Sequence, residues 1–183
     1  MFPVSSLTLR RAAAALTAGV ALAACSPTFD WRTISNDDSG YTVDLPAKPG
    51  NDQRQIEIGG VPMQMRMQTA EAGDTVFAVG TVILPKDDPQ LRDSVLAYLR
   101  DGLARNLGVP PDAHAAQIPL AMGGDVAGME MAYSGEAGPK HEQRMLHARL
   151  VAKGVHVYQA AIIGRKALPP EQLDQFFGSF KLY

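Results

Sequence analysis

The segment 147–158 gathers the side chains best suited to binding or acid–base chemistry. Two alternating runs flank a Lys-Gly pair there, which predicts a tight β-hairpin. A two-residue turn that pairs Ala152 with Val155 places four such side chains on one sheet face: His147, Arg149, His156 and Tyr158. This face could bind an anion or a metal. Cross-strand packing, with Arg149 over Tyr158, is the favoured interpretation, because no carboxylate has ligand spacing nearby.

Alternating methionines form a second unusual pattern. Met63, Met65 and Met67 share one face of an expected strand, and Met129 and Met131 repeat the alternation further along the chain. Thioethers are soft ligands that select Cu(I), but methionine also fills gaps in a core beneath a helix. Copper binding requires an exposed stripe, whereas packing requires a buried one. We expect packing, with a Cu(I) site as the alternative.

The chain has one cysteine, so Cys25 has no partner for an internal disulfide. Before it come Arg10, Arg11 and thirteen mostly small or apolar residues at 12–24. At about 1.5 Å per residue this run is too short to cross a bilayer core of about 30 Å, and it is typical of a signal peptide. The run ends in Leu-Ala-Ala-Cys, which resembles the lipobox of bacterial lipoproteins.

The lipobox implies cleavage between Ala24 and Cys25 and attachment of lipid to the cysteine thiol. More than one acyl chain, from diacylglycerol on the thiol and an added palmitate on the freed amine, would make the anchor stable. We therefore expect a signal peptide at 1–24, a lipidated tether at 25–28 and one domain at 29–183. The residue after the cysteine is Ser26, not the Asp that retains lipoproteins of Gram-negative bacteria in the inner membrane. The resemblance to those lipoproteins therefore implies transfer to the inner leaflet of the outer membrane, facing the periplasm. An ordinary secretory signal with a chance cysteine is the alternative.

The composition of the chain limits its partners. Hydrophobic residues make up 46% and charged residues 20%, as in a globular domain. From Cys25 onward there are 15 basic and 19 acidic residues. This mild acidity argues against a nucleic-acid-binding face and gives no overall attraction to anionic lipid.

Catalytic motifs are absent from the sequence. It has no Gly-x-Ser-x-Gly, no P-loop, no Gly-x-Gly-x-x-Gly, no His-Glu-x-x-His and no Cys-x-x-Cys. We therefore expect no catalytic residue and no cofactor beyond the covalent lipid. A hydrolase with an unrecognised site is the least favoured hypothesis.

The elements that position these residues follow from periodicity and turn residues. Helical spacing predicts a long helix between Asp88 and Gly108, and Pro169-Pro170-Glu171 predicts a short one near the end. A continuously apolar strand at 75–84 predicts cover on both faces. Further strands are expected over these ranges: 41–45, 53–58, 61–69, 126–134, 143–152 and 155–163. The expected fold is α+β, with a mostly antiparallel sheet, one long central helix and a short C-terminal helix.

Three segments resemble the PsbP/Mog-type α/β/α sandwich. They are Gly-Tyr-Thr-Val-Asp-Leu-Pro at 40–46, the hairpin Arg-Leu-Val-Ala-Lys-Gly-Val-His-Val-Tyr at 149–158, and Phe-Phe-Gly-Ser-Phe at 176–180. The chain is also similar to small bacterial envelope proteins with this pattern. The resemblance implies the sandwich fold and a non-catalytic role in binding another envelope protein during assembly. A periplasmic ion- or small-ligand-binding protein is the alternative.

Overall fold

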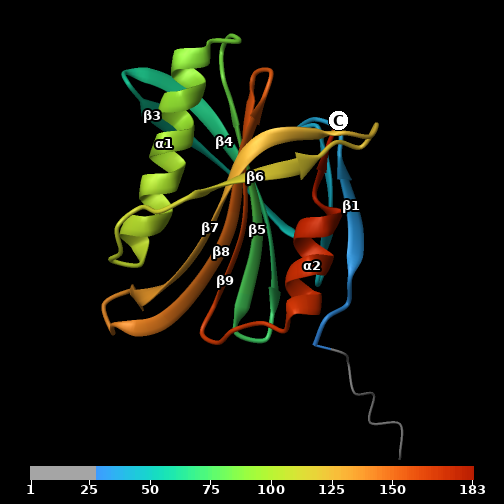
Figure 1. Ribbon diagram of the computed structural model, residues 1–183, viewed down its shortest axis with the longest axis vertical. Coiled ribbons are helices and arrows are strands. Elements are labelled where there is room, and N and C mark those ends of the chain that lie inside the picture. The colour runs from blue at the N-terminus through green and yellow to red at the C-terminus, as the bar shows by residue number, and fades with distance from the viewer. Residues whose placement is uncertain (1–27) are drawn as a thin grey trace, which may run out of the picture.

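The computed structural model describes residues 28–183 (Figure 1). It is an α+β fold with mostly antiparallel sheets and two helices, as expected. The expected signal peptide, with the cleavage site at Ala24 and the lipidation site at Cys25, lies outside the described residues.

A seven-stranded sheet forms the middle layer, in the order β3-β4-β5-β9-β8-β7-β6. Every neighbouring pair is antiparallel. Its strands are β3 (Gly50–Ile58), β4 (Val61–Ala72), β5 (Thr75–Ile83), β6 (His114–Pro119), β7 (Asp125–Ala137), β8 (Glu142–Lys153) and β9 (His156–Gly164).

Different elements pack against the two faces of this sheet, and a separate hydrophobic core lies between each face and the elements on it (Figure 1). Helix α1 (Pro89–Asn106) packs on one face. On the other face lie helix α2 (Pro170–Ser179) and a three-stranded sheet in the order β1-β2-β10. The strands of this small sheet are β1 (Arg32–Asn36), β2 (Tyr41–Leu45) and β10 (Lys181–Leu182). This second sheet was not expected from the sequence.

Helix α1 has the predicted termini. The Asp88 carboxylate accepts hydrogen bonds from the backbone N–H groups of Gln90 (3.0 Å) and Leu91 (3.2 Å). Beyond the helix, Gly108 adopts a φ of 64°, a left-handed conformation that glycine tolerates best. The helix lies outside the large sheet rather than at its centre, because only its apolar side is buried.

Strand β5 lies near the middle of the large sheet and is buried on both faces. Phe77 and Val79 contribute to the core beneath α2, whereas Val82 belongs to the core beneath α1. This double burial confirms the prediction from its continuously apolar sequence.

The β8–β9 hairpin differs from the prediction in its register. Lys153 pairs with His156, so the turn is Gly154-Val155, and the expected pairing of Ala152 with Val155 is wrong. Gly154 has a φ of 57°, which explains why the chain turns on glycine and the residue after it. The register moves by two residues, so the same side chains still share a face.

Candidate functional site

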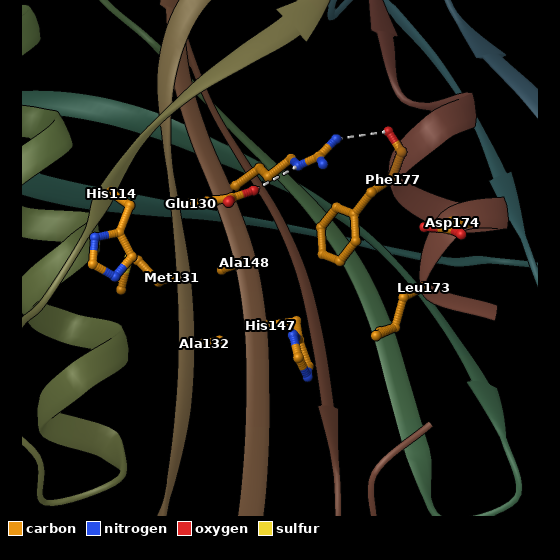
Figure 2. A pocket seen from close by; sticks show the side chains of 10 residues that line it. His114, Glu130, Met131, Ala132, His147, Ala148, Leu173, Asp174 and Phe177 are labelled. Atoms are coloured by element: carbon orange, nitrogen blue, oxygen red, sulfur yellow. Dashed lines mark hydrogen bonds and ion pairs between the residues drawn. The ribbon is translucent and has the colours of Figure 1, made fainter. Parts of the chain in front are cut away.

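The clearest pocket lies where α2 packs against the large sheet (Figure 2). It has a volume of about 220 Å³. We call it the α2 pocket; its lining residues are His114, Glu130, Met131, Ala132, His147, Ala148, Arg149, Leu173, Asp174 and Phe177. Two residues of the predicted ligand face, His147 and Arg149, are therefore brought together here.

Arg149 is the most heavily bonded residue of the α2 pocket. Its Nη1 donates a hydrogen bond of 3.2 Å to the backbone oxygen of Phe177, and Cζ lies 5.1 Å from the centre of the Phe177 ring. Its Nε lies 3.7 Å from the Glu130 carboxylate (Figure 2). The expected packing of Arg149 over Tyr158 is wrong, because Arg149 lies over the Phe177 ring of α2 and its strand neighbour is Ala160.

Helix α2 positions the apolar wall of the pocket. Pro170 occupies its first turn, where the missing N–H costs nothing, and Phe176 and Phe177 are buried beneath it. The Ser179 hydroxyl accepts a 2.8 Å hydrogen bond from the Asp44 N–H, which ties the helix to β2. The helix is thus held on both sides, by the small sheet and by Arg149 of the large sheet.

The pocket carries charge of both signs. Glu130 offsets Arg149, whereas Asp174 forms no ion pair among the described residues. Burial lowers the pKa of His147, so this imidazole is neutral at neutral pH and can donate or accept a hydrogen bond. The His114 side chain points into the same region from β6 (Figure 2). The uncompensated charge at the rim is therefore that of Asp174.

His156 and Tyr158 share the sheet face but do not line the α2 pocket. Tyr158 is 2% exposed and packs edge-on against Tyr41. Burial, and to a smaller extent the electrostatic interaction with Tyr41, raises the pKa of Tyr158 to about 12. The pKa of His156 is lowered by burial and by the positive charges of Arg66 and Lys153. The four predicted residues thus divide into two separate environments.

The methionine stripe of β4 faces α1. Met63 and Met65 are 4% and 2% exposed, and Met67 is partly buried against the same core. A Cβ added to Gly80 on the neighbouring strand would lie 2.8 Å from the Met65 methyl carbon, so glycine makes room for this side chain. The exposure that a Cu(I) site requires is absent at Met63 and Met65.

Sequence reasoning missed Glu130, Asp174 and Phe177, which come from β7 and α2. The only signal in the sequence was the alternation of side chains along β7, which assigns Glu130 to one face of that strand. The pairing of β7 with β8, which places Glu130 opposite Arg149, is visible only in the structure. Within residues 28–183, no cluster of three or more His, Cys, Asp or Glu side chains is arranged to hold a metal ion.

The sequence matches no protein-family model and no curated protein. None of the helices in the described part of the chain is long and apolar enough to cross a membrane. The fold and pocket define the chain as an α+β protein with a small charged pocket between a helix and an antiparallel sheet.

Proposed function

We propose that this chain is a lipid-anchored protein of the bacterial envelope whose domain binds another envelope protein without catalysing a reaction. Lipid on Cys25 holds it at a membrane, on the periplasmic face of the inner leaflet of the outer membrane. The α2 pocket receives a side chain of the partner.

The observation that carries the proposal is how soon after Cys25 the folded domain begins. Phe29 and Trp31 stack with ring centres 5.7 Å apart, and both contact Phe77 of the core edge-on. Only Ser26, Pro27 and Thr28 separate the cysteine from this aromatic cluster. A lipid on Cys25 would therefore hold the domain directly at the membrane surface.

The α2 pocket supports a protein partner with a basic side chain. Leu173 and Phe177 offer an apolar wall for an aliphatic stem, and Asp174 offers an acceptor for its charged end. A volume of about 220 Å³ lies below the range of about 300–1,000 Å³ typical of drug-sized ligands. The pocket is thus better matched to one lysine or arginine side chain than to a cofactor.

A relation to the PsbP/Mog-type sandwich belongs to the same proposal. Helices on both faces of the large sheet support it, with the small sheet beside α2 as an addition to that plan. Members of that group act as binding and assembly factors, which agrees with a non-catalytic role.

Two experiments test the proposal. Cells supplied with an alkyne analogue of palmitate should label the wild-type chain but not the Cys25→Ala variant. A photo-crosslinking amino acid in place of Asp174 should give a discrete adduct with an envelope protein, whereas the same group in place of the exposed Asp93 on α1 should not. Absence of label contradicts the anchor, and equal crosslinking at both positions contradicts the binding site.

A further inference from the structure

The polar face of β4 lines a second cleft, away from the α2 pocket. Gln64, Arg66 and Gln68 alternate with the methionine stripe, so they lie on the face opposite α1. Asn51 of the edge strand β3 lies opposite Gln68. Gln53 lies opposite Arg66, so both of these β3 side chains share the polar face. The turn between β1 and β2 supplies the remaining wall of the cleft, which has a volume of about 410 Å³.

Side-chain amides dominate this cleft, which we call the amide cleft. Eight of its nine lining residues have polar or charged side chains, and Met67 is the exception. Four of them carry a primary amide: Asn36, Asn51, Gln53 and Gln68. Each amide has two N–H donors and a carbonyl acceptor. The cleft can therefore donate and accept many hydrogen bonds, but it offers little apolar surface.

A chain of hydrogen bonds holds these amides in place. The buried Tyr41 hydroxyl donates to Gln68 Oε1 at 2.6 Å and accepts a bond of 3.4 Å from Asn36 Nδ2. Gln68 Nε2 donates to Asn51 Oδ1 at 3.0 Å. The Nδ2 group of Asn51 and the side-chain amide of Gln53 form no hydrogen bond with other described residues, so they are available to a ligand. Because the amides are already ordered, less conformational entropy is lost on binding.

Ser39 adds a polar group without a partner. This residue is 1% exposed and lines the cleft, and its hydroxyl forms no hydrogen bond with any described residue. Its backbone N–H, in contrast, donates to Asn36 Oδ1 at 3.0 Å. Buried hydroxyl groups are nearly always hydrogen-bonded, so an unpaired one in the wall of a cleft indicates a partner from outside the chain.

The charges around the amide cleft nearly cancel. Arg66 is the single cation in the lining, and its guanidinium lies 3.9 Å from the Asp38 carboxylate. The lining residues and their neighbours within two positions carry three acidic and two basic groups: Asp37, Asp38, Asp52, Arg54 and Arg66. Lys153 acts on the same His156 as Arg66 does, so its positive charge offsets the remaining acidic group. The cleft therefore favours a neutral ligand over a polyanion or a cation.

The hydroxyl groups of a sugar have the chemistry that this lining can recognise. A hydroxyl has one donor and two acceptor sites, so two adjacent hydroxyls can pair with one planar amide or guanidinium group. A bound peptide would instead need apolar pockets for alternate side chains, and Met67 alone does not form them.

The size of the amide cleft is also that of a ligand site. Its volume lies within the range of about 300–1,000 Å³ that is typical of such sites. We propose that the amide cleft binds a neutral saccharide through its hydroxyl groups. The proposal depends on neither the lipid anchor nor the α2 pocket.

Nuclear magnetic resonance can observe the amides of the cleft directly. The chain from Cys25 onward keeps both cores and every described element, and Cys25→Ser removes its thiol. Proton–nitrogen correlation spectra of this chain are recorded during titration with maltotetraose, cellotetraose and chitotetraose, which are neutral saccharides. A neutral peptide, tetra-alanine with both ends blocked, is titrated in the same way.

We expect at least one saccharide to shift the side-chain amide signals of Asn51 and Gln53 and the backbone signals of 51–53 and 66–68, and the peptide to shift none. A neutral hydrogen bond contributes a factor of about three to ten in affinity, so Asn51→Ala with Gln53→Ala should weaken binding by about ten- to a hundredfold. Gln117→Ala is the matched control, because Gln117 is exposed on β6 at the other edge of the same sheet. It should leave binding unchanged, and the spectra themselves show that each variant is folded.

Four results would overturn the proposal. The first is no shift with any of the three saccharides, and the second is a set of shifts confined to the α2 pocket. The third is equal weakening of binding in the control variant and the double variant. The fourth is a response to the peptide alone, which would make the occupant of the amide cleft a protein segment.

Discussion

At the scale of single residues, Arg149 joins α2 to the large sheet. It combines a hydrogen bond to the Phe177 carbonyl, a cation–π contact with the Phe177 ring and an ion pair with Glu130. A charged hydrogen bond and a partly buried cation–π contact each contribute about 1–2 kcal/mol. Arg149→Ala should therefore lower the free energy of unfolding by about 2–3 kcal/mol in urea denaturation.

Arg100 provides the control for this measurement. It pairs with Asp101, its exposed chain neighbour on α1, and such pairs contribute little. Arg100→Ala should change the free energy of unfolding by at most about 0.5 kcal/mol. Equal losses in the two variants would show that Arg149 does not hold α2.

His147 gives the fold a pH dependence. Burial lowers its pKa in the folded protein below the ordinary value of 6.5, so the unfolded chain binds the proton more readily. Stability is therefore unaffected above pH 6.5 and falls as pH drops from 6.5 towards the lower folded-state pKa. His156 acts in the same direction.

Thermal unfolding across this pH range tests the effect. The wild type should lose stability below pH 6.5, and His147→Gln should lose less. An unchanged slope in His147→Gln would contradict a buried neutral imidazole.

The sequence placed His147 and Arg149 on one face because alternation along a strand is a local property. It did not identify Phe177 or Glu130 as their neighbours, since those contacts depend on strand pairing and on where α2 packs. The register error had a local cause: Lys-Gly and Gly-Val are both plausible turns, and only the pairing of the whole strand distinguishes them.

At the scale of elements, the end of α1 is fitted closely to β7. A Cβ on Gly135 would collide with the backbone oxygen of Leu107, which cannot rotate away. Gly135→Ala should therefore destabilise the fold by about 1–3 kcal/mol in urea denaturation.

Gly102 allows the same Gly→Ala substitution at a site where we expect the stability of the fold to rise rather than fall. It lies inside α1, and a Cβ there would meet nothing within 4 Å. Gly102→Ala should stabilise the protein by about 0.5–1 kcal/mol, because alanine favours the helix. Destabilisation of similar size in both variants would contradict the packing of β7 against the end of α1.

The helices and hairpins were predictable because their caps, turns and apolar periods are local in the sequence. The small sheet was not, since β10 is only two residues long and pairs with β2, far away in the chain. The polar strand β1 also gave little signal, because most of its residues are exposed.

At the scale of the whole molecule, tether and fold are closely connected. The aromatic cluster of Phe29, Trp31 and Phe77 begins the core within a few residues of Cys25.

The mass of the N-terminal peptide of the mature protein, purified from bacterial membranes, tests the central claim most directly. The account predicts a peptide that begins at Cys25 and carries the added mass of a diacylglyceryl group and a fatty acyl chain. An unmodified Cys25, or a chain that begins at another residue, would contradict it.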